Sequence, residues 1–183
     1  MRTLPLVSLV VSLLVSRPVA AADPAAAASL ANIRPRDPGS ELLLRFGGER
    51  SPTFRAIVHE LERSHVIVYV EVREDAAHPV GGALHFIGAA GGLRWVRARV
   101  DCGTANRIRA FEDIVRLTAI LGHELRHALE AAEAPSLESL DEFARYYRRI
   151  GVDDRHLLDT LAARATGASI ESELRGGTGT RAD

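Results

Sequence analysis

The clearest helical pattern of the sequence lies in residues 111–129, which read FEDIVRLTAILGHELRHAL. Apolar residues and one threonine recur there at intervals of three and four, the spacing that places side chains on one face of an α-helix. They are Phe111, Ile114, Val115, Thr118, Leu121, Leu125 and Leu129. We expect one long helix from about Arg109 to Ala134, with this face packed in the core.

Two histidines lie on the opposite face of this helix, in the segment His123-Glu124-Leu125-Arg126-His127. Residues four apart on an α-helix are offset by about 40° and about 6 Å along the axis, so both imidazoles can reach one ion. Zinc binds imidazole nitrogen in a roughly tetrahedral site, and a neighbouring carboxylate can accept a proton from an attacking water. This is the His-Glu-x-x-His arrangement of metalloproteases. It predicts His123 and His127 as zinc ligands and Glu124 as the general base; the alternative is two surface histidines on an ordinary amphipathic helix.

The flanking sequence predicts an α+β domain. Ser51-Pro52 is typical of a helix start, and a helix is expected from about Pro52 to Arg63. Three short strands rich in β-branched residues follow, with glycines between them that suit hairpin turns. They span His65–Val72, Ala83–Ile87 and Leu93–Val100. We expect a small, mostly antiparallel sheet in which at least the last two strands pair antiparallel.

Further helices are expected after the long one. One begins near Pro135-Ser136 and ends before Gly151, and another spans Asp153 to Ala165 with an apolar stripe. That stripe consists of Leu157, Leu158 and Leu161. Residues 170–174 form a possible short last helix.

The ends of the chain have the composition of non-core segments. The apolar run Leu4 to Val15 is followed by small residues, which predicts a signal peptide over residues 1–22 with cleavage after Ala21 or Ala22. Residues 23–50 are expected to be a flexible leader, 51–175 the folded domain and 176–183 a disordered tail. The mature protein is therefore expected in the periplasm or secreted, and not in the membrane.

Charge and cysteine content narrow the possible partners and stabilising bonds. Loss of Arg2 and Arg17 with the signal peptide changes the formal net charge from −1 to −3, which does not favour nucleic acid as a partner. Cys102 is the only cysteine, so no internal disulfide can stabilise the fold. A packed core or a bound metal must do so.

The order of helix, three-strand sheet, His-Glu-x-x-His helix and C-terminal helices resembles the minimal core of zincin metallopeptidases. The resemblance spans roughly Pro52 to Leu174, and only His123, Glu124 and His127 match a motif specific enough to carry roles. It implies that Leu93–Val100 or Ala83–Ile87 is an edge strand that holds a peptide substrate. The metzincin subgroup does not fit, because Glu130 and Glu133 replace its glycine and third histidine and no methionine follows Met1. The run from His123 to Glu130, HELRHALE, followed by Tyr146 to Gly151, YYRRIG, is also similar to a group of short exported bacterial proteins of unassigned activity. This similarity favours a zincin-like fold but supplies no substrate.

A third zinc ligand is expected downstream, as in gluzincin-like enzymes. The candidates are Glu130, Glu138, Asp141, Glu142 and Asp159. Glu130 lies about 10 Å along the helix axis from His123, which suits an acid that holds a ring N–H of His127 better than a ligand. Glu142 has a structural explanation in a Ser139–Glu142 capping box. Asp159 comes from another helix, and the similar short proteins have an acid before a threonine there, so Asp159 is our choice.

Other side chains with possible chemistry are assigned no role. Tyr146, Tyr147 and His156 are possible oxyanion donors, but Tyr147 also fits a core stripe. The remaining histidines are interpreted as structural or exposed, and they are His59, His65, His78 and His85.

Three functions remain open. The first is a zinc metallopeptidase acting on a peptide or protein, with Glu124 as the base. The second is a non-catalytic binding protein that keeps the zincin scaffold, and the third is a zinc hydrolase of a non-peptide substrate. The intact Glu124 favours catalysis, because a purely structural metal site needs no base beside it.

Overall fold

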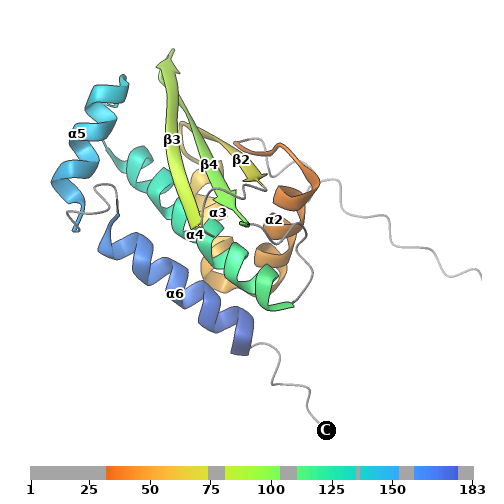
Figure 1. Cartoon of the computed structure of the whole chain (residues 1–183). Coiled ribbons are helices and arrows are strands. Elements are labelled where there is room, and N and C mark those ends of the chain that lie inside the picture. The colour runs from red at the N-terminus through yellow and green to blue at the C-terminus, as the bar shows by residue number, and fades with distance from the viewer. Residues whose placement is uncertain (1–31, 74–80, 104–110, 135–136, 153–158, 177–183) are drawn as a thin grey trace, which may run out of the picture.

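The computed structural model describes residues 32–73, 81–103, 111–134, 137–152 and 159–176. These residues form a mixed fold of five helices and one four-stranded sheet, in agreement with the predicted α+β class (Figure 1). The elements are β1 (Ile33–Pro35), α2 (Pro38–Arg50), α3 (Pro52–Glu62), β2 (Val66–Arg73), β3 (Gly81–Ala90), β4 (Leu93–Asp101), α4 (Phe111–Glu133), α5 (Leu140–Ile150) and α6 (Leu161–Gly176). The sheet has one strand more than the three predicted, because β1 lies in the segment expected to be a leader. The expected signal peptide, residues 23–31 and residues 177–183 lie outside the described part.

The leader expected over residues 23–50 is wrong for its second half, because residues 33–50 belong to the folded domain. Asp37 caps α2 by accepting a hydrogen bond from the Ser40 N–H at 2.8 Å, and Pro38 occupies the first turn. Helix α2 then buries Leu43 in the core. The polar and small residues before Glu41 indicated a linker, but Asp37-Pro38 is a helix start followed by an apolar face.

The sheet has the strand order β1-β2-β4-β3. The antiparallel pairing predicted for the last two strands is confirmed, since β3 and β4 form a hairpin. Gly91 and Gly92 make its turn with φ values of 58° and 79°, which residues other than glycine rarely adopt. The expectation of a mostly antiparallel sheet is wrong, because β1–β2 and β2–β4 are parallel. Strand β4 lies between β2 and β3, so β3 is at the edge.

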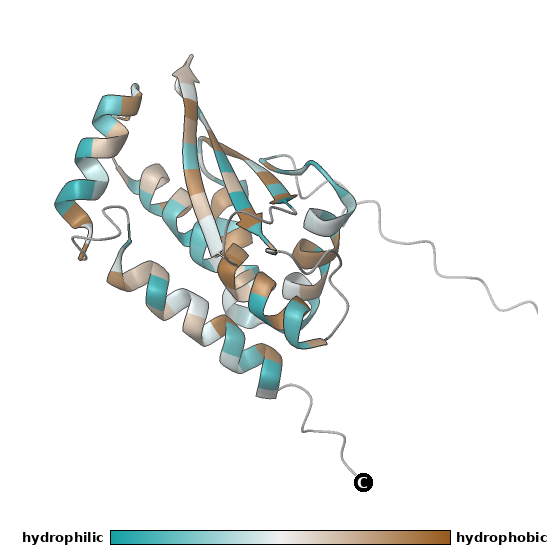
Figure 2. Ribbon diagram, in the orientation of Figure 1, coloured by the Kyte–Doolittle hydropathy of each residue, from teal (hydrophilic) through white to brown (hydrophobic). Residues whose placement is uncertain are grey.

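One face of the sheet is covered by helices and the other is largely polar. Along β4, Val96, Ala98 and Val100 are buried, whereas Arg97 between them is exposed. Figure 2 shows the resulting alternation of hydrophobic and hydrophilic residues along the strands. Helix α4 packs across β2, β4 and β3 on the buried face.

Helix α4 also packs against α2, α3 and α6, which makes it the central helix of the domain. Close approach to α6 depends on Gly122, where an added Cβ would lie 2.2 Å from Ile170 Cδ1. The expected core residues Thr118, Leu121 and Leu125 are fully buried. The predicted positions of α3, α4 and α5 and of the three strands β2, β3 and β4 are confirmed within a few residues. Within the described ranges, no helix has the length and apolar content needed to cross a membrane.

The C-terminal region differs from the sequence-based expectation. Within the described residues, a single helix, α6, spans the last part of the helix expected over 153–165 and the helix expected over 170–174, and Asp159 and Thr160 precede it. Residues 153–158 lie outside the described part. Thr160 acts as its cap, because its hydroxyl accepts a hydrogen bond from the Ala163 N–H at 3.1 Å. Leu161, assigned to an apolar stripe, is 67% exposed, and Leu157 and Leu158 lie outside the described residues.

A pair of substitutions tests this assignment of the α6 core. Ile170→Ala removes a fully buried side chain that contacts Gly122, and we expect a loss of about 2–5 kcal/mol in the free energy of unfolding. Leu161→Ala should change it by less than about 0.5 kcal/mol, because Leu161 is exposed. Urea denaturation followed by circular dichroism measures both. Equal losses would contradict the described packing of α6.

Candidate metal centre

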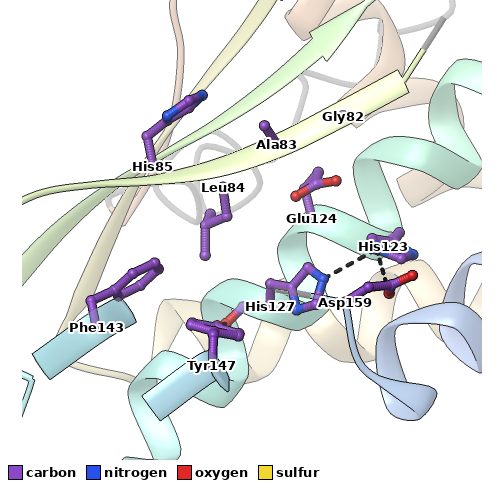
Figure 3. Close-up of a pocket in the computed structure, with 10 residues that line it drawn as sticks. All are labelled: Gly82, Ala83, Leu84, His85, His123, Glu124, His127, Phe143, Tyr147 and Asp159. Carbon is purple, nitrogen blue, oxygen red and sulfur yellow. Dashed lines mark hydrogen bonds and ion pairs between the residues drawn. The ribbon is translucent and has the colours of Figure 1, made fainter. Parts of the chain in front are cut away.

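Three predicted ligands converge on one point beside α4. His123 and His127 are one turn apart on this helix, and their Nε2 atoms are 3.1 Å apart. Asp159, just before α6, places Oδ1 3.4 Å from His123 Nε2. The ligand atoms of the three residues all lie within 4.8 Å of one another, and Figure 3 shows them meeting at the pocket wall. Asp159 therefore reaches the histidine pair from a segment next to α6 and not from within a helix.

His127 is held by a chain of buried polar groups. Its Nδ1 lies 2.9 Å from Glu130 Oε2, the contact expected from the sequence. The Thr160 hydroxyl donates to the other oxygen of Glu130 at 2.6 Å. All three residues are buried. With Nδ1–H donated to a carboxylate, the lone pair of His127 is on Nε2, which faces His123 and Asp159.

Asp159 is held in a comparable way. Arg164 Nε donates to its Oδ2 at 2.6 Å, which fixes the carboxylate and leaves Oδ1 facing the histidines. Oδ1 is buried and, among the residues that the structure describes, has no hydrogen-bond partner. A buried carboxylate oxygen without a donor is costly unless a cation satisfies it.

The geometry and charge of this cluster fit a small divalent cation. Bonds of about 2.0–2.1 Å to zinc place tetrahedral ligand atoms roughly 3.3 Å apart, close to the 3.1 Å and 3.4 Å found here. Burial lowers the pKa of His123, and the neighbouring His127 lowers it further. Both effects favour the neutral imidazole, which is the form that binds a metal. His123, His127 and Asp159 can supply three ligands and leave a fourth position open to the pocket.

Glu124 belongs to α4, and its side chain lies between this helix and the edge strand β3. Its side chain is 5% exposed, and Figure 3 shows the carboxylate directed toward Gly82. A Cβ at Gly82 would lie 2.5 Å from Glu124 Oε1, so only glycine allows this approach. Burial raises the pKa of Glu124 to about 8, and the charge of Asp159 acts in the same direction. The sequence does not indicate that the position of Glu124 depends on a glycine at position 82, because Gly82 is 42 positions before Glu124.

The cluster opens into a pocket of about 420 Å³ between β3 and α5. Leu84, Phe143 and Tyr147 form an apolar wall beside the histidines (Figure 3). Of the two strands proposed as a substrate-binding edge, β4 is excluded because it pairs on both sides. Strand β3 is the edge and lines the pocket, and within the described residues no strand pairs with its other side, where another strand could add.

Several other candidates are placed elsewhere or have structural partners. Glu142 forms the predicted capping box with Ser139, and among the described residues the metal-type cluster includes neither Glu138 nor Asp141. Tyr147 donates its hydroxyl to the backbone oxygen of His127, so it packs under the site.

Among the described residues, His85 is the one further histidine that lines the pocket. Figure 3 shows its ring on the opposite side of β3 from Leu84, away from the metal cluster. His78 and His156 lie outside the described residues.

Sequence reasoning missed Gly82, Leu84, Phe143, Thr160 and Arg164 as parts of the site. Phe143 lies in the helix expected before Gly151, and nothing in the sequence relates this residue or Leu84 to the site. Thr160 alone carried a signal, because a threonine before a helical pattern is a common N-cap.

Comparisons with known proteins relate this chain to no other protein. The chain matches no protein-family model, no curated protein and no solved structure. The arguments about function therefore depend on the residues of the site.

Gly82→Ala tests the close contact between β3 and Glu124. The added methyl group would overlap the carboxylate, and we expect a loss of about 1–3 kcal/mol in the free energy of unfolding. Gly88→Ala is the matched control on the same strand, because a Cβ there would meet nothing within 4 Å. Thermal and urea unfolding of both variants measure the difference. Comparable stabilities would show that β3 does not approach Glu124 this closely.

Proposed function

We propose that this protein is an exported zinc-dependent metallopeptidase. The observation that carries the proposal is the convergence of His123, His127 and Asp159 beside a buried Glu124, at a pocket bordered by an edge strand. Asp159 contributes an oxygen, Oδ1, that has no hydrogen-bond partner among the described residues. His123, His127 and Asp159 would hold the ion, and Glu130 and Arg164 would orient two of these ligands. When bound, zinc acts as a Lewis acid and promotes the ionisation of water near neutral pH.

Glu124 is the residue proposed to move protons. It lies next to the ligands, where its carboxylate can accept a proton from the attacking water and return it to the leaving amine. Burial holds its pKa at about 8 in the absence of a cation, so the neutral form dominates at neutral pH. A divalent cation nearby favours the charged form. Ion binding and the ability of Glu124 to act as a base are thus coupled.

The edge strand and the apolar wall are proposed to bind the substrate. An extended peptide can add to the free side of β3 through backbone hydrogen bonds, with alternate side chains entering the pocket. Leu84, Phe143 and Tyr147 exclude water from the side of the cluster that they cover. Export through the predicted signal peptide is part of the proposal, since it would place the enzyme in the periplasm or outside the cell.

The metal site is tested by zinc content and affinity. We expect about one zinc per chain in the purified protein and none in His127→Ala, because two remaining donors are too few. Asp159→Ala should weaken affinity strongly, whereas Glu130→Ala should weaken it by roughly 10-fold to 100-fold, as for a residue that orients a ligand. Elemental analysis and competition with a chelator measure both. The ligand assignment is overturned if Asp159→Ala binds zinc like the wild type and Glu130→Ala does not.

The catalytic role is tested by Glu124→Gln. The amide keeps the size of the side chain but cannot accept a proton, so hydrolysis should fall by about 100-fold to 10,000-fold while zinc content is unchanged. The measurement is cleavage of a mixed peptide library by the zinc-loaded proteins, read by mass spectrometry. Equal cleavage by both would point to a contaminant or another base. If neither protein cleaves any peptide, the result favours a binding protein or a non-peptide substrate.

A further inference from the structure

A second pocket, of about 410 Å³, borders the metal cluster on the side away from Phe143 and Tyr147. Gly82, His123 and Glu124 line both pockets, so the two pockets adjoin at these residues, and we call them the two arms of the cleft. The remaining walls of the second arm come from α4 and α6. A ligand that contacts Glu124 is therefore close to both arms at once.

The two arms differ in chemistry. The first arm has the apolar wall of Leu84, Phe143 and Tyr147. The second arm has the apolar residues Ala119, Ile120 and Ala168 in its lining, and in addition the charged residues Arg116, Arg164 and Glu171. The second arm therefore differs from the first by its arginines, which can bind an anionic group of a ligand.

Two of these three charged residues have ion-pair partners. Arg164 donates to Asp159 at 2.6 Å, and Glu171 accepts from Arg175 Nε and Nη2 at 3.2 Å and 2.9 Å. Arg116 is exposed and, within the described residues, no carboxylate lies at ion-pair distance from its guanidinium. The second arm thus holds one arginine whose charge is left for a ligand.

We propose that Arg116 binds a carboxylate of the substrate while an apolar residue of the same peptide occupies the arm at Phe143 and Tyr147. An arginine fork matches a carboxylate with two parallel hydrogen bonds, which makes it selective for acids over amides. The ligand class is a short peptide with an apolar residue close to an acidic side chain or to its own free C-terminus. The inference depends on the proposed function in that the cleft is taken to bind peptides.

Equilibrium binding tests the inference without requiring turnover. Fluorescein-labelled peptides with leucine near glutamate, before or after it, are titrated against the full chain carrying Glu124→Gln. Each peptide has a glutamine counterpart, and amidated and free C-termini separate a side-chain carboxylate from a terminal one. A charge-assisted hydrogen bond is worth about 1.5–3 kcal/mol, so the acidic member of the favoured pair should bind about 10-fold to 100-fold more tightly.

Variants then test whether the preference for acidic peptides depends on the side chain of Arg116. Arg116→Gln should abolish the advantage of the acid, and Arg116→Lys should retain part of it. Arg148→Gln on α5 is the control, because Arg148 is exposed and lines neither arm. The melting temperature of each variant verifies folding.

The outcomes separate this inference from the proposed activity. Equal binding of acidic and neutral peptides, no binding of either, or an unchanged preference in Arg116→Gln would each overturn it. If the wild-type protein cleaves peptides without any preference for acids, only the inference about Arg116 fails. If the acid preference follows Arg116 but nothing is hydrolysed, the peptidase proposal fails and the binding site remains.

Discussion

Helix α4 must pack in the core and also border the pocket, and the other elements of the domain are placed accordingly. Its apolar residues pack against the sheet, α2, α3 and α6, which buries most of the helix. The turn from His123 to His127 must nevertheless border a pocket. Two glycines make both arrangements possible where the chain segments approach most closely. Gly122 leaves room for the side chain of Ile170, and Gly82 leaves room for the side chain of Glu124. The polar groups of the site are therefore set by the same contacts that form the core.

Helix α6 joins the site to the rest of the fold through both of its ends. At its start, Thr160 bonds to Glu130 and caps the helix, while Asp159 faces His123. Near its end, Glu173 accepts hydrogen bonds from the backbone and hydroxyl of Thr53 at the start of α3. Metal affinity and stability of the C-terminal region are consequently linked, because an ion that holds Asp159 also favours the docked position of α6.

The parts of the molecule that follow from local patterns could be predicted from the sequence. The amphipathic period of α4, the Ser51-Pro52 start of α3 and the Ser139–Glu142 capping box are all local signals. The parallel pairing of β2 with β4 was not predictable in this way, because it depends on which side of the sheet the hairpin joins. Helix α2 was missed because small and polar residues at its start resemble a linker.

The same distinction applies to the candidate site. The spacing of His123 and His127 on one helix is a local property, so their proximity could be anticipated. The structure brings Asp159 next to the two histidines, and its role as a ligand stays a prediction. Its expected placement on a helix was wrong. Gly82 and Arg164 contribute to the site through contacts between segments that are far apart in the sequence. The spacing of residues along the chain does not predict such contacts.

The irregularity in β3 has a consequence for self-association. An exposed edge strand is a template for pairing with another copy of the chain, a hazard that leads to aggregation. The register of β3 shifts between Phe86 and Gly88, which is a β-bulge in the edge strand. A bulge increases the local twist and interrupts the row of available backbone groups. Only the first part of β3, from Gly81 to Phe86, offers a regular edge, so intermolecular sheet extension is limited to a short segment beside the pocket.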